Sequence, residues 1–227
     1  MSSQDAISAN SKGPTPFSAA ELDALVSAAP CLWWRAFTEL SVAAGLRVQE
    51  VLRLHSTDVC ERTLSVRITS VPVDGFGETE HVTLRRWLPH HQERVIEVPS
   101  TVMGTLGRLR SERPNDSHVF VPDWKLDQLW IRIVSNSPVT ADHMCPGIAP
   151  CFRMIQRRAR LVLARVLQRP LAEVEWQQRP LASLRVTAAA RLAERLEPSE
   201  LASCLGCASP ASVASILSHV QPTRGAA

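Results

Sequence analysis

The chain of 227 residues contains no tyrosine, and it has few lysine, glycine and aromatic residues. Without tyrosine, neither this chain nor an identical copy of it can supply a phenolic nucleophile. No apolar run approaches the roughly 18 residues that a membrane-spanning helix needs, and the start of the chain, MSSQDAISANSKG, is polar and unlike a secretory signal. We therefore expect a cytoplasmic protein whose six cysteines stay reduced.

The composition is that of a globular protein with an arginine-rich surface. Hydrophobic residues make up 45% of the chain, which is enough for a core, while the net charge is only +3. Lys12 and Lys125 are the only lysines among the 25 basic residues, so arginine supplies nearly all of the positive charge. Arginine pairs phosphate with a rigid two-pronged fork, although a GC-rich genome would favour the same residue.

The first half of the chain predicts helices and then strands. Residues 1–13 have the composition of a disordered tail. Ser18 and Glu21 then form a capping-box pattern before an apolar run. A helix is expected over residues 32–44, with Gly45 ending it, and another over residues 47–54.

Three runs then alternate apolar and polar residues, as strands do, over residues 64–69, 80–85 and 94–98. A helix is expected over residues 100–110, and a loop with three prolines over residues 135–150.

Residues 152–168 have the periodicity of an amphipathic helix. The apolar arc consists of Phe152, Ile155, Ala159, Val162, Leu163 and Val166. The arginines of the other face are Arg153, Arg157, Arg158, Arg160, Arg165 and Arg169. Such a face is either a track for nucleic-acid phosphates, with Arg153, Arg157 and Arg160 as contacts, or a solvated surface.

The stretch from 180 to 220 predicts three short helices with sharp ends. The first covers residues 183–196, and Pro198 breaks it. Ser199 is expected to cap the second, which Gly206 ends because glycine tolerates a positive φ. Ser209 and Pro210 suit the cap and first position of the third helix, which runs to His219.

Three short motifs resemble the catalytic domain of tyrosine recombinases, the phage integrase family. The segment from Ala44 to Leu52, AGLRVQEVL, is similar to the family's first arginine motif, T-G-L-R-x-x-E-x-L. Ala182-Ser183-Leu184-Arg185 stands where the family has H-x-x-R, and Leu205-Gly206-Cys207 stands where it has Leu-Gly-His. The resemblance implies one domain over residues 14–220, followed by a disordered tail at 221–227. It implies an α+β fold that is mainly helical with a small three-stranded antiparallel sheet.

The resemblance also assigns site positions and marks the site as degenerate. The family's catalytic positions correspond here to Arg47, His90, Ala182, Arg185, Cys207 and Ile216, or to Leu217 in place of Ile216 if one residue is inserted. The two arginines would hold a DNA phosphate, with Glu50 orienting Arg47. The position of the nucleophilic tyrosine is apolar.

The leading hypothesis is a DNA-binding accessory protein of recombination or integration that does not cleave DNA itself and is associated with the nucleoid. Its expected partners are double-stranded DNA and an active recombinase or a second copy. Docking would use the last helix, through Ala211, Val213, Ala214, Ile216 and Leu217. One alternative is a protein–protein interaction module on a decayed recombinase fold. Another is an active recombinase with an unrecognised nucleophile, such as Cys207, or with a partner's tyrosine.

No cofactor, metal or membrane is expected. Cys204 and Cys207 form a C-x-x-C pattern, and His143, Cys145 and Cys151 are possible further ligands. Two well-spaced ligand pairs, which mark a structural zinc site, are not present.

Overall fold

The computed structural model describes residues 14–68, 94–112, 114–116, 118–120 and 144–218. The predicted strand at 80–85, His90 and both predicted tails lie outside these residues. The helices, including two 3-10 turns marked η, are α1 (Ala19–Ala28), α2 (Leu32–Ala44), α3 (Val48–Leu52), η2 (Ser56–Asp58), α5 (Ser100–Ser111), α7 (Met144–Val166), η4 (Leu171–Glu173), α8 (Ala182–Ala193), α9 (Pro198–Leu205) and α10 (Pro210–Leu217). The strands are β1 (Val59–Cys60), β2 (Ser65–Ile68) and β3 (Arg94–Glu97).

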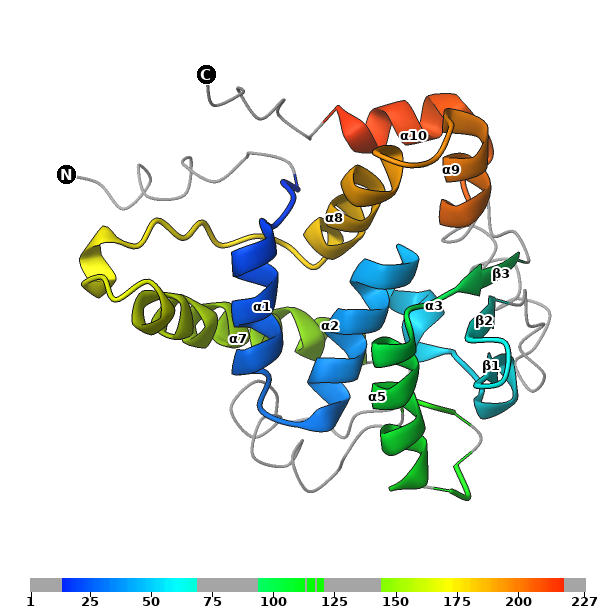
Figure 1. Ribbon diagram of the computed structural model, residues 1–227, viewed down its shortest axis with the longest axis horizontal. Helices are drawn as coiled ribbons and strands as arrows, with labels where there is room; N and C mark the ends of the chain where they lie inside the picture. The colour runs from blue at the N-terminus through cyan, green and yellow to red at the C-terminus, as the bar shows by residue number, and fades with distance from the viewer. Residues whose placement is uncertain (1–13, 69–93, 113, 117, 121–143, 219–227) are drawn as a thin grey trace.

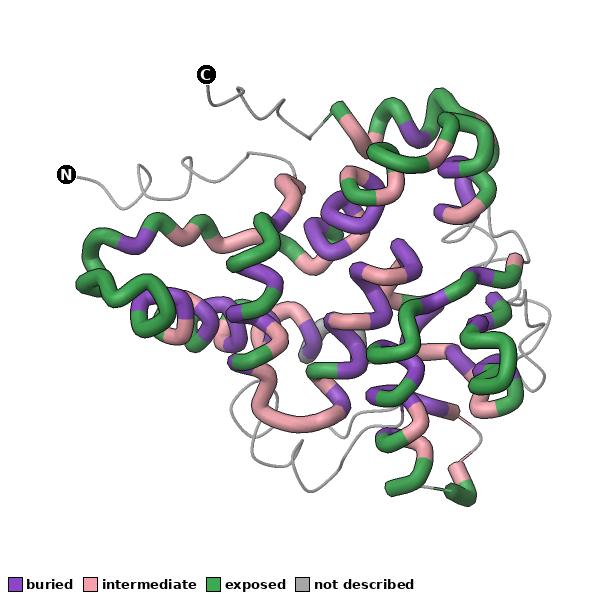
Figure 2. The backbone as a smooth tube through the Cα atoms, viewed as in Figure 1, coloured by how far each residue is buried: buried purple, intermediate pink, exposed green. Residues whose placement is uncertain are grey.

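Helix α2 lies at the centre of the helices, with α1, α5 and α8 packed against it (Figure 1). Helix α7 packs along α1 on the side away from the sheet. The largest fully buried side chains of this core include Phe37, Phe120 and Phe152. In Figure 2 most of α2 is coloured as buried, while the outer faces of α7, α9 and α10 are exposed. The apolar faces that the sequence predicts therefore meet in one main core.

A three-stranded antiparallel sheet lies at the edge of the helical core, in the order β1-β2-β3. This confirms the predicted fold class. The sheet differs from the prediction in one strand, because β1 at Val59–Cys60 was not expected. A strand of two residues is too short to show alternation, so the sequence gives no signal for it.

Several predicted helix ends are confirmed. Ser18 and Glu21 form the capping box of α1, with bonds of 3.3 and 2.8 Å. Gly45 ends α2 with φ of 61°, and Gly206 ends α9 with φ of 60°. Ser209 caps α10, with Pro210 at its first position. These ends follow from local chemistry, which is why the sequence alone predicts them.

Three local predictions are corrected. Pro198 begins α9 rather than only breaking the chain, and Glu197 is the cap instead of Ser199. Proline suits a first helical position because its missing N–H has no partner there. The predicted loop at 135–150 is helical from Met144, with Pro150 inside α7. Val166, predicted to lie on the apolar arc, is 71% exposed at the last position of α7.

Helices α8, α9 and α10 enclose a second, smaller core. Its buried members are Ala189, Leu201, Ala202, Leu205, Cys207 and Val213. Ile216 and Leu217 pack partly buried against this cluster, whereas Ala211 and Ala214 are exposed. The apolar side of α10 therefore packs on its own chain.

Among the described residues no single helix has both the length and the apolar character to cross a membrane. Helices α9 and α10 meet these limits only as a pair, with a bend of 85° between them, and core helices of soluble proteins do the same.

Candidate anion-binding site

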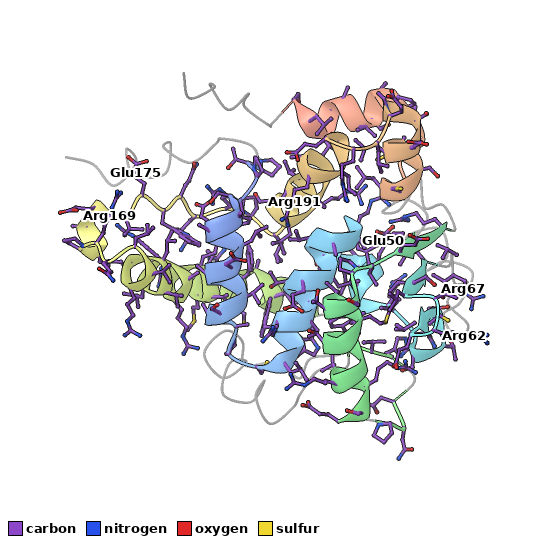
Figure 3. All side chains as sticks on the ribbon, viewed as in Figure 1. Glu50, Arg62, Arg67, Arg169, Glu175 and Arg191 are labelled. Atoms are coloured by element: carbon purple, nitrogen blue, oxygen red, sulfur yellow. The ribbon has the colours of Figure 1, made fainter. Side chains whose placement is uncertain are left out.

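Three arginines surround one buried carboxylate where α3, β3 and α9 approach one another. The carboxylate belongs to Glu50, which Figure 3 labels at this junction and whose side chain is 1% exposed (Figure 3). Arg47, Arg94 and Arg185 contribute the guanidinium groups. We call these four residues the arginine cluster.

Arg47 and Glu50 lie one helical turn apart at the start of α3. The backbone N–H of Arg47 donates to Oε2 of Glu50 at 2.7 Å, and Nη1 donates to Oε1 at 3.1 Å. Glu50 thus fixes both the cap and the side chain of Arg47. The predicted orienting role of Glu50 fits this geometry. The Arg47 side chain is 27% exposed and reaches solvent.

Arg185 enters from the first turn of α8. Its Nη1 donates to the carbonyl oxygen of Gly45 at 2.8 Å, and Nη2 donates to that of Leu205 at 2.7 Å. Nη1 lies 3.9 Å from Oε2 of Glu50. Burial lowers the pKa of Arg185, the positive charge of Arg47 lowers it further, and Glu50 acts in the opposite direction. The structure therefore brings Arg47 and Arg185, the two arginines of the motifs, to the same carboxylate.

Arg94 is the member of the cluster that the sequence reasoning missed. Its Nη1 and Nη2 donate to the two carboxylate oxygens of Glu50, each at 3.0 Å, and Nε donates to the carbonyl oxygen of Cys204 at 2.9 Å. The side chain is only 6% exposed. The signal was the alternation of β3, which places residue 94 on the buried face with Ile96 and Val98.

The end of α9 supplies three successive carbonyl oxygens to the three arginines. Arg94 donates to Cys204, Arg185 to Leu205, and Arg47 to Gly206 at 3.2 Å. The last carbonyl groups of a helix have no partner within it and carry partial negative charge, so arginines stabilise them. The cluster thus fixes α9 to α3 and β3.

The glutamate stays ionised because of its partners. Burial alone would raise the pKa of Glu50, but the hydrogen bonds and charge of Arg94, together with Arg47, outweigh burial and hold the pKa below its ordinary value of 4.5. Three positive groups and one negative group leave the cluster with two net positive charges. A net positive, partly exposed site of this kind favours an anion.

The remaining predicted positions that the structure describes carry little acid–base chemistry. Ala182 is exposed in the first turn of α8. Cys207 is 7% exposed, and its Sγ accepts from Nη2 of Arg185 at 3.5 Å. Ile216, at the expected tyrosine position, packs on the smaller core. Within the described part of the chain, no group of three or more His, Cys, Asp and Glu residues is placed to hold a metal ion.

Helix α7 extends away from the cluster, and Figure 3 labels Arg169 just beyond its end. Arg153, Arg157, Arg158, Arg165 and Arg169 are exposed. Arg160 is different, because its Nε and Nη2 donate to the carbonyl oxygens of Val174 at 3.1 Å and Leu171 at 2.8 Å. It therefore secures η4 to the helix rather than standing in an exposed row.

No protein-family model matches the chain, and no curated protein matches it. Solved structures do match it. XerA recombinase is 18% identical with a TM-score of 0.61, and the match covers 93% of this chain and 62% of that one. Tn1549 transposon integrase, solved in complex with transposon right end DNA, is 14% identical with a TM-score of 0.60 and coverage of 97% and 67%. A lambda integrase dimer bound to a COC' core site is 14% identical with a TM-score of 0.56 and coverage of 96% and 52%.

These similarities show that the chain has the fold of tyrosine recombinase and integrase catalytic domains. The chain spans roughly half to two thirds of the length of these structures. Fold and function are separate questions, because one fold hosts many sites.

Proposed function

We propose that the chain binds the phosphate backbone of double-stranded DNA through Arg47 and Arg185, and that it serves DNA recombination or integration without cleaving DNA itself. The observation that carries the proposal is the charge of the arginine cluster. Three guanidinium groups share one carboxylate, and Arg47 keeps 27% of its side chain exposed. DNA phosphates are the polyanion that such a site suits.

The hydrogen-bonding capacity of the cluster supports the same ligand. Arg47 donates side-chain bonds to Glu50 and to the carbonyl of Gly206. A guanidinium has five N–H groups in a planar fork, so further donors remain for a phosphate oxygen. Each charge-assisted bond to phosphate contributes about 1.5–3 kcal/mol. Two structures of similar fold add support for DNA as the ligand. Tn1549 integrase was solved with transposon right end DNA, and lambda integrase was solved with a COC' core site.

The chemistry of the site argues against strand cleavage. The sequence has no tyrosine, and Ile216 packs its apolar side chain on the smaller core. A serine or cysteine nucleophile needs an adjacent base or a lowered pKa. Cys207 is only 7% exposed, so its sulfur has little access to a phosphodiester. A role as accessory or regulator fits a phosphate clamp without a nucleophile.

Salt-dependent binding to a fluorescent duplex tests the proposal. Removing one side chain that binds a phosphate reduces the slope of log affinity against log salt by about one, because fewer counterions are released. We expect Arg47→Ala/Arg185→Ala to weaken binding and to lower the slope by about two relative to the unmodified chain. Binding that is absent at low salt, or indifferent to both substitutions, would exclude this function.

A nicked suicide substrate tests the absence of cleavage separately. We expect no covalent protein–DNA adduct on denaturing gels. An adduct that disappears with Cys207→Ala would show an active strand transferase with a cysteine nucleophile, and one that appears only with an added recombinase would show that the partner supplies the nucleophile.

A further inference from the structure

Arg94 is too deeply buried to contact DNA, yet it binds the carboxylate of Glu50 with both prongs of its guanidinium. Its side chain is 6% exposed and pairs both oxygens of Glu50 at 3.0 Å. A bidentate pair of this kind outcompetes single contacts for a carboxylate. Arg185 Nη1 is left at 3.9 Å from the same glutamate, beyond hydrogen-bond distance.

The charges show what this arrangement achieves. The charge of Arg94 offsets that of Glu50, so the cluster keeps a net charge of +2 for a ligand even though Arg47 also pairs with Glu50 at 3.1 Å. Arg47 and Arg185 face the same site, and their mutual repulsion is part of what lowers the pKa of Arg185. Without Arg94, the negative charge of Glu50 would be balanced only by Arg185 and Arg47. The net charge of the site would then fall from +2 to +1.

We infer that Arg94 is a positioning residue for phosphate binding: it holds Glu50 neutralised by a two-pronged bond, and so sets the charge that Arg47 and Arg185 present to the DNA backbone. The inference rests on the proposed function. It adds a residue that does not touch the DNA and a mechanism that works through the charge of Glu50.

The backbone around Arg94 is shaped for this role. Its Nε bonds the carbonyl oxygen of Cys204 at 2.9 Å. A Cβ added to Gly206 would lie 2.7 Å from its Cζ, so the guanidinium lies close against the backbone of that glycine. The bond to Cys204 and the contact with Gly206 therefore help to hold the fork directed at Glu50.

Charge restoration distinguishes this role from a structural one. Arg94→Gln lowers the net charge of the cluster from +2 to +1 and should weaken duplex binding about tenfold or more, in line with the loss of one charge-assisted contact. Arg94→Gln/Glu50→Gln returns the charge to +2 and should recover binding to within a few fold. Thermal melting of each variant identifies an assay temperature at which it is folded.

Arg94→Lys keeps the positive charge but loses the two-pronged geometry of the guanidinium. It is the variant to test if Arg94→Gln does not stay folded. It should retain the salt slope of the unmodified chain.

The matched control is the Arg67–Asp58 pair on the neighbouring strand, with bonds of 3.0 and 3.1 Å and an Arg67 side chain that is 58% exposed. Arg67→Gln makes the same change in total charge and should alter binding far less than Arg94→Gln.

Three results would overturn the inference: Arg94→Gln binding like the unmodified chain, the folded double variant binding as weakly as Arg94→Gln, or Arg67→Gln weakening binding equally. Failure of the proposed function has a different signature, because binding would then be indifferent to Arg47→Ala/Arg185→Ala as well.

Discussion

Arg94 and Glu50 form a two-pronged ion pair, with 3.0 Å for each bond, between a strand and a short helix that are 44 residues apart. Both side chains are almost fully buried, at 6% and 1% exposure. Through Glu50 the pair fixes Arg47, and through Cys204 it fixes the end of α9. Substitutions in this network should therefore change both stability and the response to pH.

Removing the carboxylate should be strongly destabilising. Glu50→Ala leaves three guanidinium groups without their shared counter-charge, and breaking a buried pair in this way costs about 3–5 kcal/mol. Urea denaturation followed by circular dichroism measures the loss. The matched control is Glu61→Ala, which removes the exposed pair with Arg110 at 3.1 Å and should cost less than about 1 kcal/mol. Equal losses at the two positions would contradict the role given to Glu50.

Acid should weaken the same network. The folded state holds the pKa of Glu50 below 4.5, so the stabilisation from its ionised form is complete above that pH and is lost as the pH falls through the lower, folded-state value. The free-energy gap between the unmodified chain and Glu50→Gln should therefore stay constant from pH 7 to about 5 and shrink at lower pH. Urea titrations at each pH measure it. A free-energy gap that widens on acidification would show that the pKa of Glu50 is raised, not lowered, in the folded state.

Gly206 should not tolerate a side chain. Its φ is +60°, and an added Cβ would press on the guanidinium of Arg94. Gly206→Ala should destabilise by about 1–2 kcal/mol from backbone strain alone, with the contact adding to it. Gly104 in α5 is the control, because a Cβ there meets nothing within 4 Å. Gly104→Ala should stabilise by about 0.5–1 kcal/mol. Thermal melts of the two variants should therefore shift in opposite directions.

The arginines of α7 should divide by their contacts. Arg157 is exposed, so Arg157→Gln should leave stability unchanged and reduce the salt slope of DNA binding by about one if the helix follows the backbone. Arg160 bonds the carbonyls of Leu171 and Val174, so Arg160→Gln should loosen η4 and lower stability by about 1 kcal/mol per bond. Hydrogen exchange at 171–174 reports the loosening. If Arg157→Gln leaves the salt slope of DNA binding unchanged, the arginine face of α7 faces solvent and does not contact DNA.

The sequence predicts most of the helices and several of their ends, although the helix expected over residues 183–196 ends at Ala193. Capping residues, positive-φ glycines and apolar spacing act within a few residues, so Ser18, Gly45 and Gly206 reveal helix ends without any tertiary information. The motif resemblance likewise places Arg47 and Arg185 in one site, where the structure brings them within contact of the same Glu50.

Other features depend on contacts between distant segments, which the sequence does not show. The strand at Val59–Cys60 forms because β2 lies beside it. The packing of Ile216 and Leu217 depends on where α8 and α9 lie, and here both residues pack on their own chain.

The sequence by itself determined the fold class, several helix ends, the absence of a tyrosine and the two motif arginines that lie beside Glu50. Only the tertiary structure decided which groups surround Glu50 and therefore the net charge of the site. It brings Arg94 from β3 to Glu50 of α3, and it places the carbonyls of residues 204–206 against three arginines. The reason is physical: periodicity and caps are local properties of the backbone, whereas the partner of a buried charge is chosen by packing across the whole chain.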